Sequence, residues 1–462
     1  MAGKWPYKRV EEIALKVAMG PFGSSIKVET FTDKGIPIIS GQHLREAELT
    51  DSEFNFITEE HADSLKNANV QRGDVIFTHA GNIGQVAFIP NHSKYQRYVI
   101  SQRQFYLRCD TSLILPEFVV YYFKSPEGQH KLLANANQVG VPSIARPSSY
   151  LKTIEVPVPS IEEQQIVVRN IKALDAKIRA NRRINQTLEA MAQAIFKSWF
   201  VDFDPVKAKI AAIEQGQDPL RASMRTISGK TDAELNQMPH EYHKQLAATA
   251  ALFPDAMEES ELGEIPKGWK AGILAEICHL NPESWSAKTL PNTVNYVDLA
   301  NTKSGEISEL QVVSGKDIPS RARRILRSGD TIVGTVRPGN RSFALVGKEN
   351  LTGSTGFAVL RPIAQEWLEF VYLVATSGSN IDRLTHLADG GAYPAVRPEV
   401  VVQGNIVIPD RMLAQAFHQY VQPFWVNILE NRKSTEILAE LRDVLLPDLL
   451  SGNIYIQREE DR

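Results

Sequence analysis

Two long stretches of the chain share one pattern of apolar positions. Over residues 161–199, apolar residues recur alternately three and four positions apart, and the same spacing returns over residues 411–450. This spacing is typical of a helix that packs along a narrow stripe against another helix. Aligning Pro159 with Pro409 gives an offset of 409 − 159 = 250, which matches the two stretches without a gap. The sequence therefore predicts a duplicated long helix.

The duplication also predicts how the two helices pack. A lone helix of this kind is usually an amphipathic surface helix, but two copies of one unit usually pack about a pseudo-twofold axis. We therefore expect an antiparallel pair, roughly 60 Å long, which holds the preceding segments far apart. Pro423 and Pro447 should bend the second helix or end it early. The predicted seam of the pair consists of Ile171, Leu174, Ile178, Asn181, Leu188, Ile195, Phe424, Ile428, Asn431, Leu438 and Leu445.

A different pattern precedes each helix. Between Trp5 and Pro157, short apolar runs at residues 36–39, 75–77 and 86–89 alternate with glycines, which indicates strands joined by turns. Helical spacing appears over residues 117–133. The stretch RGDVIFTHAGNIGQVAFI is echoed later by RSGDTIVGTVRPGNRSFALVG, with Gly-Asp pairs at a shift of 330 − 74 = 256. The strand-rich part is therefore duplicated as well.

These patterns predict an α+β fold in which two mixed α/β domains, in a pseudo-twofold arrangement, are joined by an antiparallel coiled coil of two long helices. The second domain opens at LGEIPKGW, where Trp269 is followed by a short helical run as Trp5 is in the first. Residues 207–262 carry no long apolar period and suggest a partly helical surface insert. The predicted parts are domain 1 (1–157), a first spacer helix (158–206), the insert (207–262), domain 2 (263–407), a second spacer helix (408–453) and a tail (454–462).

Composition excludes several classes of protein. The 462 residues carry a net charge of −3, which argues against a generally basic nucleic-acid coat protein but leaves local basic faces open. Cys109 and Cys278 are the only cysteines and match neither zinc-site nor disulfide spacing, so a reducing cytoplasm fits best. The sequence contains no run of 18 apolar residues, which a membrane span would need, and its first residues do not resemble a secretion signal.

The sequence lacks the motifs of the obvious enzymes. The adenine methyltransferase loop, Asn/Asp-Pro-Pro-aromatic, has no better match than residues 281–284, which read NPES. No phosphate-binding loop for ATP is complete, because the glycine-rich pieces at 20–24 and 81–84 fit turns better, and no His or carboxylate cluster suggests a metal site. Function is therefore expected to lie in binding.

Four segments resemble the specificity subunit of type I restriction-modification systems, usually called HsdS. They are PVPSIEEQQIVV, AIFKSWFVDFDPVKAK, ELGEIPKGW and LLPDLLSGNI, and they fall at the boundaries of the predicted parts. The resemblance implies that domains 1 and 2 each recognise one half of a split target in double-stranded DNA. It further implies that the helices, with the seam residues above, space these domains and dock two methyltransferase subunits, which a restriction (translocase) subunit joins later.

The resemblance carries expectations about chemistry and location as well. The subunit itself would hold no cofactor and catalyse no reaction. S-adenosylmethionine would belong to the methyltransferase subunits, and ATP and Mg²⁺ to the restriction subunit, within a complex that defends a bacterial or archaeal cytoplasm against foreign DNA. Such subunits differ most in the interior of the two domains, so the resemblance does not indicate which bases this chain prefers.

Candidate DNA-binding residues follow from side-chain chemistry. Residues 317–341 hold six arginines against Asp317 and Asp330, and such a cluster suits phosphates or, through a bidentate contact, guanine; a solvated arginine face is the alternative. Domain 1 offers the loop 78–82 and the segments SQRQF and PSIARPSSY, the last matched in domain 2 by GGAYPAVRP. The candidates are Thr78, His79, Asn82, Gln102, Arg103, Gln104, Arg146, Tyr150, Arg321, Arg323, Arg324, Arg337, Arg341, Tyr393 and Arg397.

Two other classes of protein remain as alternatives. A stand-alone methyltransferase or nuclease would need the motifs that are missing, and incubating the pure chain with S-adenosylmethionine and DNA tests it. A coiled-coil scaffold without sequence-specific DNA binding would explain the helices but leave the two elaborate domains unexplained, and a gel shift tests that. Asn181 and Asn431, equivalent in the repeat, are expected to fix helix register rather than touch DNA.

Overall fold

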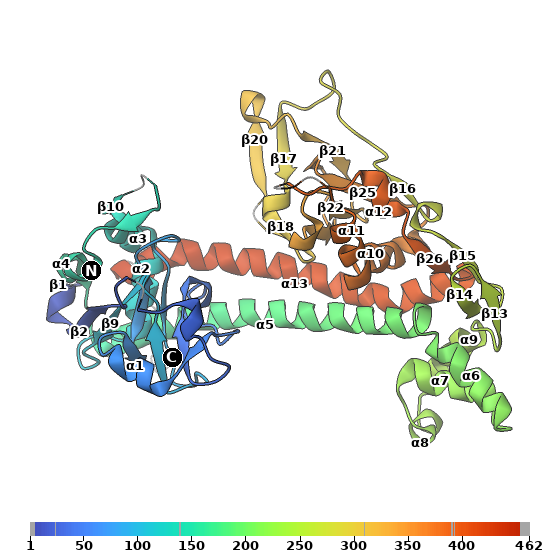
Figure 1. Cartoon of the computed structure of the whole chain (residues 1–462), viewed down its shortest axis with the longest axis horizontal. Helices are drawn as coiled ribbons and strands as arrows, with labels where there is room; N and C mark the ends of the chain where they lie inside the picture. The colour runs from blue at the N-terminus through green and yellow to red at the C-terminus, as the bar shows by residue number, and fades with distance from the viewer. Residues whose placement is uncertain are drawn as a thin grey trace, which may run out of the picture. The chain divides into compact units, whose positions relative to one another are not determined.

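The computed structural model describes residues 5–23, 25–137, 140–308, 310–389, 391 and 393–452 (Figure 1). The chain divides into two compact units, one formed by Met1–Asn181 with Lys433–Arg462 and the other by Arg182–Arg432. Each long helix contributes one half to each unit.

Domain 1, in unit 1, contains two four-stranded sheets. In the first, the order is β2-β9-β6-β7 and all neighbours are antiparallel; in the second, the order is β4-β3-β8-β5, and β3 and β8 run parallel. The apolar runs at 36–39 and 75–77 form the central strands β3 and β6, and the run at 86–89 forms the edge strand β7. The strands are β2 (Ala14–Met19), β3 (Ile36–Ile39), β4 (Phe56–Ile57), β5 (Asn69–Gln71), β6 (Val75–Thr78), β7 (Val86–Phe88), β8 (Arg97–Ile100) and β9 (Gln104–Cys109).

The helical stretch predicted over residues 117–133 is two helices. Ser125 ends the first, and its hydroxyl accepts a hydrogen bond from the backbone N–H of Gly128 at 3.2 Å. Pro126 then occupies the first position of the next helix, where its missing N–H costs nothing. The helices of domain 1 are α1 (Glu59–Ser64), α2 (Pro116–Lys124), α3 (Pro126–Leu133) and α4 (Pro147–Thr153); β1 (Tyr7–Arg9) pairs with β12 (Glu155–Pro157), and β10 (Ala136–Asn137) with β11 (Ser143–Ile144).

Domain 2, in unit 2, repeats this topology. Its sheets run β16-β25-β22-β23 and β20-β17-β24-β21, and β17 and β24 are again parallel. The strands are β16 (Cys278–Leu280), β17 (Thr293–Val297), β20 (Gln311–Ser314), β21 (Ala322–Leu326), β22 (Thr331–Gly334), β23 (Phe343–Leu345), β24 (Leu351–Ser354) and β25 (Phe357–Pro362). The helices are α10 (Leu368–Thr376), α11 (Gly378–His386) and α12 (Pro398–Val402), β15 (Lys270–Ile273) pairs with β26 (Asn405–Ile408), and a short hairpin joins β18 (Thr302–Lys303) to β19 (Glu306–Ile307). The duplication read from the sequence is therefore a duplication of fold.

The repeated Gly-Asp pairs close a structural turn in each domain. Asp74 is buried, accepts the backbone N–H of Gln71 at 2.9 Å and forms a bidentate pair with Arg108 of β9, with both N–O distances at 2.7 Å. In domain 2, Asp330 is buried and pairs with Arg361 of β25 at 2.7 and 2.8 Å. Each carboxylate thus joins a turn to the neighbouring strand, so the motif is part of the scaffold.

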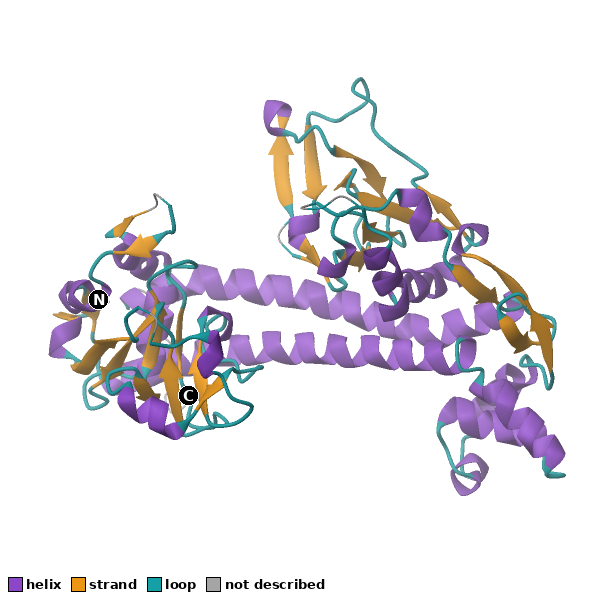
Figure 2. Ribbon diagram, viewed as in Figure 1, coloured by secondary structure: helices purple, strands orange, loops and turns teal. Residues whose placement is uncertain are grey.

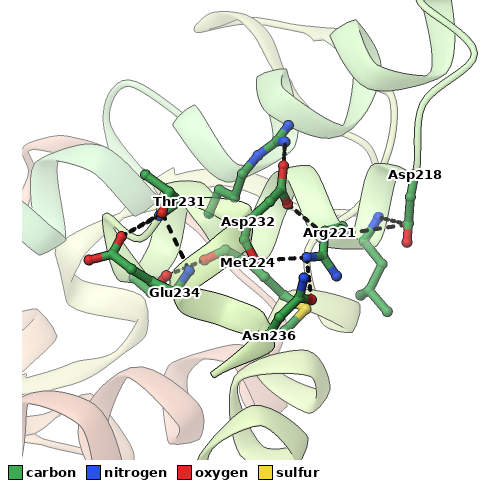
Figure 3. Close-up of polar contacts among 10 residues, drawn as sticks. Asp218, Arg221, Met224, Thr231, Asp232, Glu234 and Asn236 are labelled. Atoms are coloured by element: carbon green, nitrogen blue, oxygen red, sulfur yellow. Dashed lines mark hydrogen bonds and ion pairs between the residues drawn. The ribbon is translucent and has the colours of Figure 1, made fainter. Parts of the chain in front are cut away.

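The insert of unit 2 is a cluster of four helices, more ordered than its weak apolar period predicted. Asp232 accepts hydrogen bonds from Arg221 and Arg225 at 2.5 and 2.6 Å, and Thr231 and Glu234 cap the same short helix reciprocally (Figure 3). These polar contacts tie the surface of the cluster together. The helices are α6 (Asp204–Glu214), α7 (Pro219–Ser228), α8 (Asp232–Asn236) and α9 (His240–Ala251), followed by the β13 (Met257–Ser260) and β14 (Gly263–Pro266) hairpin.

The apolar side chains of the insert belong to the main core of unit 2. Val206, Met224, Leu235 and Phe253 are all buried in the cluster that also contains Trp199 of the first long helix. The insert thus shares its hydrophobic core with the domain it contacts. It is therefore an integral part of unit 2.

The two long helices are α5 (Ile161–Phe200) and α13 (Arg411–Ser451), which lie side by side (Figures 1 and 2). Within unit 1, Asp175 of α5 pairs with Arg442 of α13 at 3.0 Å. Within unit 2, the rings of Phe196 and Phe417 lie 6.0 Å apart. As the residue number rises along α5 it falls along α13, so the helices are antiparallel, as predicted.

Pro423 and Pro447 do not end the second helix, because α13 runs unbroken from Arg411 to Ser451. A proline inside a helix removes one backbone hydrogen bond and costs about 3 kcal/mol. The packed seam offsets that cost: Val421 and Trp425 flank Pro423 and are buried in the core of unit 2. The expected early end was wrong, since tertiary packing outweighs local propensity here.

The polar seam residues pair across the helices. In unit 1, Asn181 donates to Ser434 at 3.2 Å and to Thr435 at 3.5 Å. In unit 2, Asn431 donates to Asn185 at 2.9 Å. Residues 185 and 435 are equivalent at the offset of 250, so the same pairing occurs once in each unit. These hydrogen bonds can form in only one alignment of the two helices, so they hold the helices in register.

Candidate DNA-binding loops and helix pair

Three segments of domain 1 are joined at one end of the sheet that contains β6. The backbone N–H of His79 donates to the carbonyl of Arg103 at 2.9 Å, and the carbonyl of His79 accepts from Ile144 at 2.8 Å. Gly81 donates to the carbonyl of Pro142 at 3.0 Å. The loop after β6, the turn before β9 and the segment before α4 therefore form one surface, named here the loop edge of domain 1.

The predicted site residues of this loop edge divide by burial. Thr78 and Gln104 are buried, which leaves them to support the strand ends. His79 is half-buried, its ring contacts the carbonyl of Gln102 at 3.1 Å, and burial lowers its pKa. Tyr150 donates to the carbonyl of Lys131 at 2.5 Å and is thus engaged within the domain. The exposed candidates are Asn82, Gln102, Arg103 and Arg146.

Domain 2 forms its loop edge with the same hydrogen bonds. Thr335 donates to Gly356 at 2.8 Å and accepts from Val396 at 2.9 Å, while Arg337 donates to Pro394 at 2.7 Å. The loop after β22, the turn before β25 and the segment before α12 therefore meet as their counterparts do in domain 1. This pairing of segments agrees with the match proposed between PSIARPSSY and GGAYPAVRP.

The side chains on the loop edge of domain 2 are mainly basic and aromatic. Arg337 is exposed, adopts a left-handed backbone with φ of 48°, and holds its guanidinium 4.8 Å from the ring centre of Tyr393. Tyr393 is 72% exposed. Arg341 is exposed on the same loop, and Arg397 is exposed at the start of α12. A guanidinium held close to an aromatic ring is preorganised for contacts with an acceptor group.

The arginines around β21 are less available than their spacing suggested. Arg321 forms an ion pair with Asp298 and donates to the hydroxyl of Tyr296 at 2.9 Å. Arg327 forms a bidentate pair with Glu283, with both distances at 2.6 Å. The local count of acidic residues missed Asp298 and Glu283, which are distant in sequence.

These arginines also lie at different places along the strand. The carbonyl of Arg321 accepts from Thr355, next to the loop edge, whereas Arg327 lies at the Asp330 turn, which precedes β22. Arg323 and Arg324 lie between them and are half-buried, and burial lowers the pKa of Arg324. The loop edge therefore gathers Arg321, Arg337, Arg341, Tyr393 and Arg397, and leaves the other three apart.

The predicted seam residues are shielded from solvent to different degrees. Ile171 and Ile178 are buried in unit 1, Ile428 is buried in unit 2, and the remaining seam positions are buried or half-buried. Other positions on the two helices carry apolar side chains exposed to solvent, which the seam pattern did not single out. These are Ile437, Leu441 and Val444 in unit 1, and Ile184, Met191 and Val426 in unit 2.

Two kinds of feature are absent from the described residues. Among them, no group of three or more histidine, cysteine or carboxylate side chains is placed to hold a metal ion. None of the helices in the described part of the chain combines the length and the apolar character needed to cross a membrane.

Comparison with known proteins defines the class. Residues 3–190 match the family model described as the type I restriction modification DNA specificity domain. The chain is 30% identical over 415 residues to the HindI specificity subunit of Haemophilus influenzae, covering 83% of this chain and 87% of the relative. It is 23% identical over 474 residues to the MjaIX specificity subunit of Methanocaldococcus jannaschii, covering 98% and 94%. The chain belongs to the family of type I restriction enzyme specificity subunits.

A solved structure supports the fold. The crystal structure of the S subunit of a type I restriction-modification system from M. genitalium matches with a TM-score of 0.51 and 13% sequence identity, covering 98% of this chain and 97% of that one. At this identity the likeness concerns the fold alone. Within a restriction-modification system, the family assigns this chain to DNA sequence specificity rather than to catalysis.

Proposed function

We propose that the chain recognises a bipartite DNA sequence, with one half-site for each loop edge. The proposal rests on one observation: the same backbone hydrogen bonds hold three segments together in domain 1 and in domain 2, while the exposed side chains differ. One scaffold with two sets of side chains suits a reader of two different sequences. We assign residues 1–157 and 263–407 to the two target-recognition domains, with boundaries at the long helices.

The exposed candidates have the chemistry to contact DNA. Arginine can bind guanine O6 and N7 through two hydrogen bonds, and asparagine and glutamine can bind adenine N6 and N7 in the same way. Domain 2 offers Arg337, Arg341 and Arg397, and domain 1 offers Asn82, Gln102, Arg103 and Arg146. Because the chain has a net charge of −3, these local groups, rather than an overall basic surface, would supply the attraction.

The paired helices α5 and α13, within the segments 158–206 and 408–453 that the sequence predicted as spacers, are the proposed docking surface for two methyltransferase subunits. Their seam is filled by the pairing itself, so a partner reaches only the outer faces, where Leu441 and Val444 in unit 1 and Ile184 and Met191 in unit 2 are exposed. Exposed apolar side chains grouped on a helix favour association with another helix. Restriction subunits would then join this assembly.

The proposed complex assigns the cofactors to the partners. S-adenosylmethionine would bind the methyltransferase subunits, and ATP with Mg²⁺ would bind the restriction subunits. The purified chain alone is expected to bind DNA weakly and to transfer no methyl group. Robust methyl transfer by the chain alone would contradict the proposal.

The decisive experiment exchanges one domain. Residues 263–407 are replaced by the corresponding segment of a relative, and methylated adenines are mapped across the genome of a host that carries all subunits. One half of the methylated sequence should change while the other half and the spacing remain. A change in both halves, or a continuous methylated sequence, would overturn the two-reader proposal.

A further inference from the structure

The hydrogen bonds of the loop edges determine which residues of the two domains correspond. Gly81 and Arg337 each donate to the proline carbonyl of the third segment, at 3.0 and 2.7 Å. Arg103 and Gly356 each accept the bond from the residue that begins the loop, His79 or Thr335, at 2.9 and 2.8 Å. Position by position, Gly81 therefore matches Arg337 and Arg103 matches Gly356.

These two positions carry the same two residue types in exchanged places. Domain 1 has glycine on the loop and arginine on the adjacent turn, and domain 2 has arginine on the loop and glycine on the turn. Gly81 and Arg337 both adopt a left-handed backbone, with φ of 83° and 48°. The loop therefore has a similar backbone conformation in both domains. The two domains differ in which segment, loop or turn, carries the arginine side chain.

The guanidinium of Arg103 lies beside the loop position that is empty of a side chain in domain 1. A Cβ atom built on Gly81 would lie 3.3 Å from Nη1 of Arg103. That Cβ marks the direction in which the side chain of Arg337 leaves the loop in domain 2. The side chain of Arg103 thus reaches from the turn to the place where the other domain begins its arginine.

The same comparison explains why domain 2 has no side chain on the turn. A Cβ atom on Gly356 would lie 2.6 Å from Cδ1 of Leu299, too close for any real contact. Leu299 is the first residue of a 3-10 helix (Leu299–Asn301) that follows β17, and the corresponding helix after β3 (Gly41–His43) begins with Gly41. A leucine in domain 2 therefore fills space beside the turn, and domain 1 has no side chain at the corresponding position.

We propose that Arg103 and Arg337 are functional counterparts: each domain presents one guanidinium to its half-site at the same point of the loop edge, delivered from different segments. The inference rests on the proposed function, since it concerns how each half-site is read. It predicts that the arginine of domain 1 can be moved from the turn to the loop without losing recognition.

The ligand is an acceptor group of DNA, and substitution distinguishes its two possible sources. A guanine edge needs the planar fork of arginine, so Arg103→Lys would lose selectivity for one base in the half-site of domain 1. A phosphate accepts lysine nearly as well, and its contact would make binding more dependent on salt at every sequence. Arg103→Ala removes either contact.

The test uses the complete methyltransferase complex and its cognate DNA. Affinity and single-base discrimination are measured for Arg103→Ala, for Arg103→Gly, and for Gly81→Arg combined with Arg103→Gly. The two single variants should weaken cognate binding by about 5- to 150-fold, the range for one good bidentate contact. The double variant should recover to within about threefold of the unmodified complex. Arg97→Ala, which removes a half-buried arginine that pairs with Asp63 and donates to Asn69 in the same domain, is the control and should bind normally.

Thermal unfolding of each variant separates recognition from folding. If the double variant unfolds at a lower temperature than the parent, the binding measurements on Arg103→Ala and Arg103→Lys decide the inference instead. Normal binding by Arg103→Ala, or a stable double variant that stays as weak as Arg103→Gly, would overturn the inference. The proposed function would fail differently, because the unmodified complex itself would then show no bipartite specificity.

Discussion

Domain 1 and domain 2 have the same scaffold and differ in what they present. Their sheets have the same strand order, and their loop edges are held by corresponding backbone hydrogen bonds. The exposed side chains, by contrast, are amides with two arginines in domain 1, and arginines with a tyrosine in domain 2. Backbone bonds that ignore side-chain identity allow the reading surface to change while the fold stays constant.

The two domains also differ in how they pair their buried aspartates. In domain 1, Asp74 pairs with Arg108. In domain 2, Arg361 pairs with Asp330 and also with Glu283, while Arg327 and Arg361 together lower the pKa of Glu283 to about 2. The network of domain 2 is therefore redundant where that of domain 1 depends on one carboxylate.

The largest effect is expected from a charge placed in the helix pair. Leu188 packs against the core of unit 2, and Leu438 is half-buried at the equivalent position in unit 1. Leu188→Asp or Leu438→Asp should lower the free energy of unfolding by about 4 kcal/mol, since each buries an unpaired carboxylate. Urea unfolding and size-exclusion chromatography of the assembled complex measure the losses of stability and of partner binding.

Met191→Asp provides the matched control for this prediction. Met191 lies on the same helix, three residues after Leu188, and is 45% exposed. It should leave the unfolding free energy nearly unchanged, although it lies on the proposed docking face. Normal stability and assembly of Leu188→Asp would show that the seam has been misread.

A smaller and unequal effect is expected from the buried aspartates. Asp74→Ala leaves Arg108 without its carboxylate and should destabilise domain 1 by about 3 kcal/mol. Asp330→Ala should cost less, about 1–2 kcal/mol, because Glu283 still pairs with Arg361. Unfolding followed by hydrogen exchange assigns each loss to its domain. Equal losses would refute the redundancy, and Asp63→Ala, which breaks an exposed pair, serves as the control.

A loss of stability with rising pH should be confined to unit 2. Glu369, in the first turn of α10, contacts His418 at 2.6 Å, and this bond, reinforced by the charges of Glu369 and Glu366, raises the pKa of His418. Its stabilisation is complete below the unfolded pKa of about 6.5 and is lost as the pH rises through the higher pKa of the folded state. In unit 1, the corresponding Glu117 lies 3.9 Å from Lys172, so its ionic partner is a lysine rather than a histidine.

The measurement compares the stability of the two units between pH 6 and pH 8.5. Unit 2 should lose stability with rising pH, and His418→Gln should remove that loss. Unit 1 should change in the opposite direction near pH 6, because burial lowers the pKa of His43 and His79. A loss in unit 2 that survives His418→Gln would mean that another group is responsible.

The sequence alone predicted what depends on repetition and periodicity. The offset of 250 placed Asn181 and Asn431 at equivalent positions, and each pairs across the helices as the antiparallel seam required. The Gly-Asp pairs located corresponding turns because in each domain the buried aspartate joins the turn to an arginine of the neighbouring strand. Such features are local or repeated along the chain, and the sequence alone therefore reveals them.

The remainder depends on contacts between residues distant in sequence. Glu283 neutralises Arg327 from 44 positions away, so a count of local charges overstated the basic cluster. The correspondence of Arg103 with Gly356 is hidden by loops of different length, and only the backbone hydrogen bonds reveal it. The helix through Pro423 likewise reflects core packing that propensity does not include.

The smallest effect concerns the ring beneath Arg337. Tyr393 lies 4.8 Å from that guanidinium, whereas the corresponding residue of domain 1, before Pro142, is the exposed Val141. A stacked cation at an exposed site gains about 0.5–1 kcal/mol, so Tyr393→Ala should weaken binding to the half-site of domain 2 by about two- to fivefold. Tyr393→Phe keeps the ring and should bind normally, as should Val141→Ala. Titration of the methyltransferase complex with cognate DNA, and with DNA altered in one half-site, measures the change. Equal weakening by Tyr393→Phe would assign the effect to the hydroxyl group, and the two loop edges would then differ in more than the origin of their arginine.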